Sequence, residues 1–213
     1  FILPKFFLEN CGAYLAAIRS IGRTEEYFYM PVFESAAMIP PQTRREALTE
    51  VRAQLDTVSG SILNIRVGGN DLSHAFGLRR PANRTIYDLR PVADILIDIV
   101  AAFGTQYVVS GPVWEYYSGE GWEEGLRREM ELDLLNGFTG KTVIHPNQIP
   151  VVNEMLRVSQ RDYADARAIL NWDTGSGSLV SASEDGGRMN EYNTHSRWAR
   201  RIVLRAERYG VRA

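Results

Sequence analysis

The feature that most constrains the fold of this chain is a regular alternation of short strand-like runs with longer helix-like segments. The strand-like runs cover 1–5, 27–33, 62–67, 107–110 and 141–144, and the helical patterns cover 9–21, 44–55, 92–103, 123–136 and 148–157. Strands that alternate with helices form a parallel sheet covered by those helices. A barrel of eight such units needs about 250 residues. The five units in these 213 residues would therefore supply about five-eighths of one.

Composition narrows the class of protein. The chain has 24 Lys and Arg against 26 Asp and Glu, and its arginine pairs are interleaved with acidic or apolar residues, so we expect no nucleic-acid partner. The longest apolar run, 95–103, is interrupted by Asp98 and is too short to span a membrane. The single cysteine, Cys11, excludes an internal disulfide and suits a reducing compartment. Together these features predict a cytoplasmic protein.

Two carboxylates follow neighbouring strands of the predicted sheet. Glu34 closes the second strand-like run, and Asp71 comes shortly after the third, with one helical segment between them. A strand–helix–strand unit places its strands side by side and parallel, so both carboxylates should emerge at the carboxyl ends of the strands. Parallel barrels keep their chemistry at that rim. Two hard oxygen ligands favour Mg²⁺ over Zn²⁺.

Five segments, taken in order, resemble motifs of the HpcH/HpaI aldolase and citrate lyase β-subunit superfamily. They are Leu3-Pro4-Lys5, Phe33-Glu34-Ser35-Ala36, Gly68-Gly69-Asn70-Asp71-Leu72, the run 137–149 with its Lys141 and His145-Pro146, and Gly187-Arg188-Met189-Asn190-Glu191. The resemblance implies a (β/α)8 TIM barrel, of which residues 1–172 supply about the last five units. Residues 173–213 would then be a C-terminal lid and oligomerisation segment. The apolar start, 1–7, suits a central strand, so we expect further units upstream.

The same resemblance implies a Mg²⁺-dependent carbon–carbon lyase or aldolase acting on a 2-oxo acid or an acyl-CoA through a metal-stabilised enolate. Citryl-CoA, malyl-CoA and citramalyl-CoA are typical substrates of such enzymes. Glu34 and Asp71 would bind the metal, and Lys5, Gly68, Gly69 and Asn70 would lie against the substrate. In the family the C-terminal segment often covers the site of a neighbouring subunit. We therefore expect a homo-oligomer in which Glu191 moves a proton.

Departures from the family leave alternatives open. The family's substrate-carboxylate arginine lies on an earlier strand, Glu191 stands where several members have Asp, and 37 positions separate Glu34 from Asp71. The chain could be a non-catalytic barrel that binds small acids, or a thioesterase on the same scaffold. Each of these residues also has an ordinary structural interpretation. Asp71 could cap a helix and the Gly68-Gly69 pair could form a simple turn. Lys5 could reach solvent, and His145 could serve packing. The polar run 173–187 is equally a linker.

Overall fold

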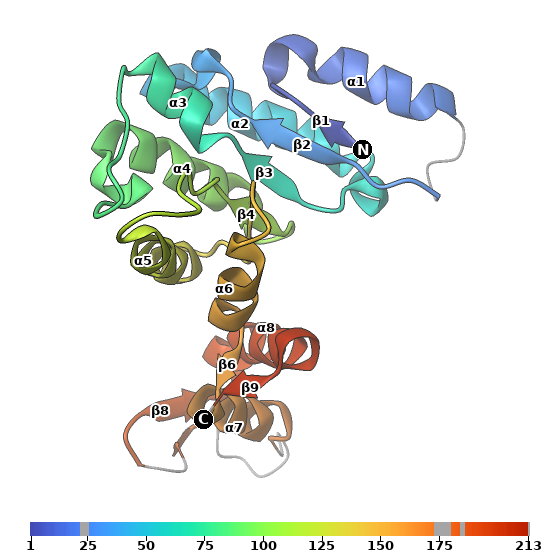
Figure 1. Ribbon diagram of the computed structural model, residues 1–213. Coiled ribbons are helices and arrows are strands. Elements are labelled where there is room, and N and C mark those ends of the chain that lie inside the picture. The colour runs from blue at the N-terminus through green and yellow to red at the C-terminus, as the bar shows by residue number, and fades with distance from the viewer. Residues whose placement is uncertain (22–25, 173–179, 184–185, 213) are drawn as a thin grey trace. The chain divides into compact units, whose positions relative to one another are not determined.

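The computed structural model describes residues 1–21, 26–172, 180–183 and 186–212, which form two compact units, Phe1–Val152 and Asn153–Ala213 (Figure 1). The first unit is built on a five-stranded parallel sheet in the order β1-β2-β3-β4-β5. The strands are β1 (Ile2–Leu3), β2 (Met30–Phe33), β3 (Ile65–Val67), β4 (Val109–Gly111) and β5 (Gly140–Lys141). The predicted α/β class with a parallel sheet is confirmed. Over the described residues this sheet is open, with β1 and β5 at its edges.

Helices connect these strands in the predicted order. The long ones are α1 (Leu8–Ile21), α2 (Pro41–Asp56), α4 (Arg90–Phe103) and α5 (Trp122–Leu135), with α6 (Gln148–Met155) after β5. Short 3-10 turns lie at Ala36–Met38, Ser59–Ser61 and Ile86–Asp88. One expectation is wrong: the Gly, Ser and Arg content of residues 70–83 predicts a loop, yet they begin inside a helix, α3 (Gly69–Ala75). Its first turn contains Asp71, a favourable place for a carboxylate, and the short helix offers too few turns for a periodic signal.

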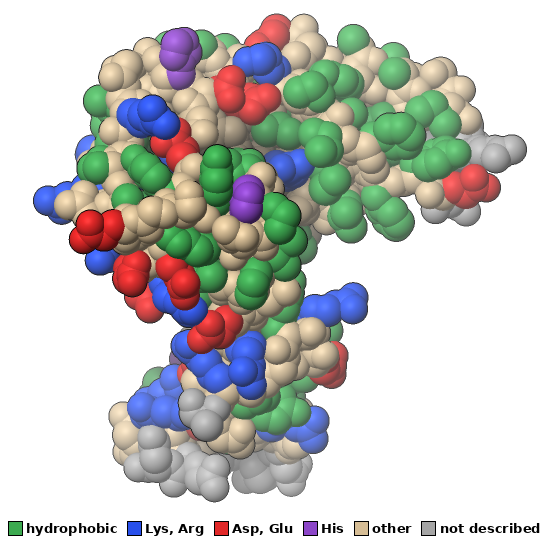
Figure 2. Space-filling model, in the orientation of Figure 1, with side chains coloured by type: hydrophobic (Ala, Val, Ile, Leu, Met, Phe, Trp, Pro, Cys, Tyr) green, Lys and Arg blue, Asp and Glu red, His purple; other side chains and the backbone are tan. Residues whose placement is uncertain are grey.

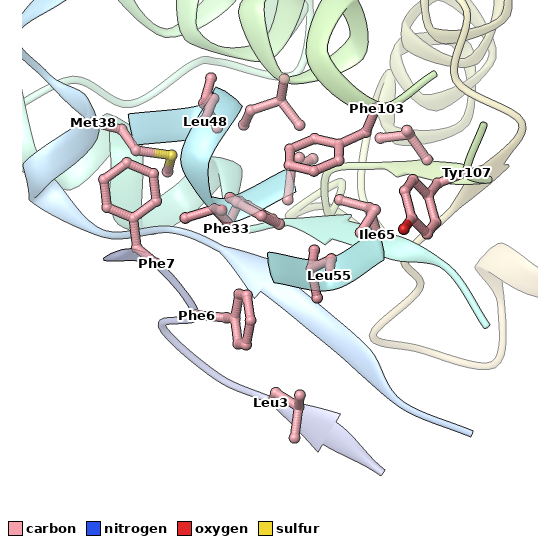
Figure 3. Close-up of a cluster of buried hydrophobic side chains, with 14 of the residues drawn as sticks. Leu3, Phe6, Phe7, Phe33, Met38, Leu48, Leu55, Ile65, Phe103 and Tyr107 are labelled. Carbon is pink, nitrogen blue, oxygen red and sulfur yellow. The ribbon is translucent and has the colours of Figure 1, made fainter. Parts of the chain in front are cut away.

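The main core lies between the sheet and its helices (Figure 3). Phe33 of β2 is fully buried and its ring lies 5.0 Å from that of Phe103 on α4. Leu48 and Leu55 of α2 are buried in the same cluster, together with Ile65 of β3. Alternate strand residues thus face the helices, as the twofold repeat of a strand requires. This packing fixes which strand residues face away from the helices.

The surface of the first unit is unevenly apolar. Figure 2 shows hydrophobic side chains gathered over the part of the molecule that carries β1 and β2. At least half of each of the side chains Ile2, Phe28 and Leu63 is exposed, and all three lie in or just before a strand. These three exposed apolar residues sit toward the amino ends of their strands, whereas the charged candidate residues follow the carboxyl ends.

The second unit is small and has its own core. Its helices α7 (Gln160–Leu170) and α8 (Tyr192–Tyr209) pack together through Ala166, Ile169, Ala199 and Ile202, with short strands beside them. These strands are β6 (Val158–Ser159), β7 (Val180–Ala182), β8 (Met189–Glu191) and β9 (Val211–Arg212). The α8 helix begins at Tyr192, within the predicted C-terminal segment 173–213. Much of the predicted linker, 173–187, lies outside the described residues, and the division at residue 172 stays a prediction. Within the described ranges, no helix is long and apolar enough to cross a membrane.

Candidate metal and substrate site

Glu34 and Asp71 lie at the same rim of the sheet. Glu34 directly follows β2, and Asp71 occupies the first turn of α3, which begins two residues after β3. The two strands are parallel neighbours, with Val32 opposite Arg66 and Phe33 opposite Val67. Both carboxylates therefore leave the carboxyl ends of adjacent strands. Glu34 is half-buried, whereas the side chain of Asp71 is 47% exposed.

Lys5 joins the two carboxylates. Its backbone N–H donates to Glu34 Oε1 at 3.0 Å, and its Nζ lies 3.1 Å from Asp71 Oδ1. Lys5 has a φ of 50°, in the left-handed region that few non-glycine residues adopt. The turn after β1 thus aims a backbone donor at one acid and an ammonium at the other. The hydrogen bond to Asp71 and the charge of that carboxylate raise the pKa of the Lys5 ammonium.

The two glycines before Asp71 are sites of close packing. A Cβ on Gly68 would lie 2.2 Å from Glu34 Oε2 and 2.4 Å from Glu34 Cβ, so only glycine leaves room for the acid. A Cβ on Gly69 would lie 2.5 Å from Ile86 Cδ1 and 2.7 Å from Pro112 Cβ. The Gly68 N–H is used within the sheet, since it donates to Phe33 O at 3.0 Å. The pair therefore seats α3 against the sheet and makes space for Glu34.

Asn70 stands between this glycine pair and Asp71. Its Oδ1 is buried and has no hydrogen-bond partner within the part of the chain that the structure describes. A buried acceptor without a donor is uncommon and costs free energy. Asn70 thus has a buried amide oxygen that no described residue satisfies.

The donor set at this rim fits Mg²⁺ better than a transition metal. Nowhere in the described ranges do three or more His, Cys, Asp or Glu side chains gather in a way that could hold a metal. Mg²⁺ is usually held by one or two carboxylates and keeps several waters or substrate oxygens, whereas structural Zn²⁺ sites take four protein ligands. Glu34 and Asp71 supply two hard oxygen ligands and leave the remaining positions open.

Glu191 closes β8 in the second unit. Its N–H lies 3.0 Å from His195 Nδ1, which accepts this hydrogen bond, and its side chain is half-buried. The segment that carries it is tied to α7, because Arg188 pairs with Asp162 at 2.9 Å and Asn190 Nδ2 donates to Asp165 Oδ1 at 3.0 Å. Glu191 thus sits on an anchored strand, and its role in the reaction stays a prediction.

A buried ionic network lies beside the rim, and the sequence pattern did not reveal it. The side chain of Lys141 on β5 is fully buried, and its Nζ lies 2.7 Å from both Glu129 Oε1 and Asp133 Oδ2 of α5. Arg80 Nε lies 2.9 Å from the other oxygen of Glu129, and the Tyr87 hydroxyl donates to Asp133 Oδ1 at 2.8 Å. Burial raises the pKa of the Asp133 carboxyl. Two cations and two anions thus lock β5 to α5.

The buried side chain of Gln148, the first residue of α6, joins the loops that follow β4 and β5. Gln148 Nε2 donates to the carbonyl oxygens of Trp114 and Tyr116, each at 2.8 Å, and Gln148 Oε1 accepts from the Ile144 N–H at 2.9 Å. His145 stacks on Tyr117 with ring centroids 4.3 Å apart. The run 137–149 thus holds the rim together, and the packing interpretation of His145 agrees with this geometry.

Comparison with known proteins identifies the family. Residues 1–211 match the family described as carbon–carbon bond lyase of the TIM-barrel fold. An L-malyl-CoA/β-methylmalyl-CoA lyase of Cereibacter sphaeroides is 38% identical over 74 residues, which cover 34% of this chain and 22% of that protein.

Two solved structures share the fold at low sequence identity. A citrate lyase from Burkholderia xenovorans superposes with a TM-score of 0.70 at 16% identity, over 100% of this chain and 64% of its own. CitE from Mycobacterium tuberculosis, solved in complex with magnesium, acetoacetate and coenzyme A, gives 0.61 at 20%, over 97% and 77%. This chain spans only part of each of these proteins. It belongs to the carbon–carbon bond lyase family of the TIM-barrel fold.

Proposed function

We propose that this chain carries the metal- and substrate-binding rim of a Mg²⁺-dependent carbon–carbon lyase that acts on a 2-oxo acid or an acyl-CoA. The observation that carries the proposal is the meeting of Glu34 and Asp71 at one rim, joined through Lys5. The Mycobacterium relative, with magnesium, acetoacetate and coenzyme A in its complex, supports this chemistry. Citryl-CoA and malyl-CoA are the kinds of substrate we would try first.

Glu34 and Asp71 would hold Mg²⁺. When bound, the ion would supply Lewis-acid stabilisation of negative charge that develops on a substrate carbonyl oxygen. Lys5 contributes in two ways: its N–H holds one oxygen of Glu34 in place, and its exposed ammonium is free to meet a substrate carboxylate once Asp71 has another cation. Asn70, which follows the glycine pair, would lie against the substrate, as the family resemblance implies.

The experiment is a turnover screen on the full-length protein with acyl-CoA thioesters and 2-oxo acids, run with Mg²⁺ and with a chelator. We expect cleavage that needs Mg²⁺ and is lost in Asp71→Asn and Glu34→Gln. Asp94→Asn, at an exposed helix position, serves as the control. Turnover that persists in the chelator or in Asp71→Asn would contradict the proposal.

One observation favours a non-catalytic alternative. The Lys5–Asp71 ion pair already places a cation on one of the two acids. A protein that only binds small acids could use Lys5 in this way without a metal. The alternative predicts that carboxylic acids bind equally well with and without Mg²⁺ and that no thioester or 2-oxo acid is turned over. The third possibility, thioester hydrolysis, would release free CoA without breaking a carbon–carbon bond. Analysis of the products therefore distinguishes hydrolysis from carbon–carbon cleavage.

We further propose that Glu191 handles a proton at the rim of a neighbouring subunit in a homo-oligomer. Glu191→Gln and Asp71→Asn should each be inactive, yet a mixture should regain activity, because hybrid oligomers contain sites with both acids intact. Glu207→Gln, an exposed position on α8, should stay active. Absence of recovery in a mixture shown by sedimentation to exchange subunits would refute the shared site.

A further inference from the structure

Arg66 lies on the face of the sheet that points away from the helices. Its strand neighbours Ile65 and Val67 are buried in the core, with 0% and 2% of their surface exposed, whereas Arg66 is half-buried. Since successive side chains of a strand alternate between faces, Arg66 projects from the opposite face, on the same side as Gly68 two residues later. Glu34 lies on that side, because a Cβ on Gly68 would touch its carboxylate.

The guanidinium of Arg66 leans toward the rim. Along the sheet, Arg66 is level with Ser110 of β4, which is level with Gly140 of β5. Nevertheless, Arg66 Nη2 donates to Thr142 Oγ1 at 3.2 Å, and Thr142 lies two residues beyond Gly140. Two residues of a strand span about 6.6 Å. The guanidinium therefore lies about two strand residues closer to the carboxyl-end rim than the Arg66 Cα does. This is near the level at which Gly68 makes room for Glu34.

Within the described residues, no acidic side chain pairs with Arg66. Its hydrogen bond to Thr142 uses one of the five N–H donors of a guanidinium. Two neighbours on this face, Asn64 and Ser110, are neutral: Asn64 Nδ2 donates to Ser110 Oγ at 2.7 Å, and the buried Asn64 Oδ1 has no partner in that same part of the chain. A half-buried guanidinium with most of its donors unused can bind a carboxylate in bidentate fashion.

We infer that Arg66 binds a second carboxylate of the substrate, one that does not meet the metal, and so selects dicarboxylic acids over monocarboxylic ones. The inference rests on the proposed function only for the position of the other end of the substrate at Glu34 and Asp71. Thr142 orients the guanidinium, and Lys5, on the far side of the two acids, is left for the first carboxylate.

The first test compares two four-carbon 2-oxo acids that differ in one terminal carboxylate, oxaloacetate and 2-oxobutyrate. Their affinities for the full-length protein are measured by calorimetry with saturating Mg²⁺. We expect Arg66→Gln to weaken oxaloacetate at least about tenfold, as for loss of a charged hydrogen-bonded pair, and to change 2-oxobutyrate less than about twofold. Arg66→Lys should retain part of the preference. Arg79→Gln is the control, because Arg79 is exposed and pairs with Glu115.

The second test separates this inference from the proposed function. Malonate binding to the metal-free protein is followed by ligand-observed NMR, and Mg²⁺ affinity is measured on the same variants. If Arg66→Gln no longer binds malonate but keeps its Mg²⁺ affinity, the result supports Arg66 as the binding site of a substrate carboxylate. This holds even if the wild type fails to turn over any substrate. If Arg66→Gln binds malonate as the wild type does, or weakens both 2-oxo acids equally, Arg66 serves structure alone and the inference is overturned.

Discussion

Replacing Lys141 by methionine should destabilise the first unit strongly, and by an amount that depends on pH. The substitution removes the shared cation from Glu129 and Asp133, both of which are buried. Glu129 keeps Arg80 and the Ile86 N–H, which donates at 2.7 Å, but among the described residues Asp133 keeps only the Tyr87 hydroxyl. The cost therefore falls mainly on Asp133. Removing one partner of a buried ion pair costs about 3–5 kcal/mol of unfolding free energy.

Protonation of Asp133 limits this penalty. From the ordinary aspartate pKa of 3.8, holding the carboxyl protonated at pH 7.5 costs about 5 kcal/mol, and this falls by about 1.4 kcal/mol for each pH unit toward acid. Burial raises the folded-state pKa of Asp133 above its ordinary value, so the buried carboxyl takes up a proton at a higher pH than in the unfolded chain, and the penalty shrinks toward acid. The Lys141→Met penalty should thus stay below about 2.5 kcal/mol at pH 5.5.

Urea unfolding at both pH values, followed by tryptophan fluorescence, measures the effect. Trp114 is a suitable probe because it is fully buried and lies 5.2 Å from the Arg80 guanidinium. Adding Asp133→Asn to Lys141→Met should restore most of the loss, because an amide carries no charge and can still accept from Tyr87. Arg90→Met is the control: Arg90 is 84% exposed in an i,i+4 pair, and its loss should cost less than about 0.5 kcal/mol. A Lys141→Met penalty that is as small as the control's, or equal at both pH values, would refute this reasoning.

Two further predictions concern the rim. Gly68→Ala should push Glu34 aside, which should lower Mg²⁺ affinity at least about tenfold and the free energy of unfolding by about 1–3 kcal/mol. The control is Gly12→Ala, in open space on α1, which should leave Mg²⁺ binding unchanged and stabilise the protein by about 0.5–1 kcal/mol. If calorimetry and urea unfolding showed both variants behaving alike, the prediction would be wrong. Lys5→Met should tighten Mg²⁺ binding by about fivefold, since it removes a competing cation from Asp71, and should weaken 2-oxo acid binding. An unchanged Mg²⁺ affinity in Lys5→Met would show that the ammonium does not compete.

The parts of the fold that the sequence predicts are those with strong local patterns. The β2–α2–β3 unit has an apolar strand on either side of a helix that begins at Pro41, and the predicted helix falls within α2, ending one residue before it. Because Glu34 and Asp71 come shortly after those strands, their shared rim follows from topology alone.

The remaining features depend on contacts between distant segments. The contact between Lys5 and Glu34 needs a left-handed backbone at a lysine, which no residue pattern announces. Glu129 and Asp133, four residues apart on α5, have the spacing of a solvated helix face, and only the burial of Lys141 turns them into a core network. In the sequence, nothing distinguishes Arg66 from any other arginine of a strand. Only the register of the sheet shows that it lies beside Thr142.

Mg²⁺ affinity tests the central claim most directly, namely that Glu34 and Asp71 together form the metal site. Calorimetry on the full-length protein should give one Mg²⁺ site per chain in the wild type and in Asp94→Asn. In Glu34→Gln and in Asp71→Asn the affinity should fall at least about tenfold, since losing even a residue that only orients a metal ligand typically costs about that much. Mg²⁺ affinity that is the same in both variants as in the wild type would contradict the account.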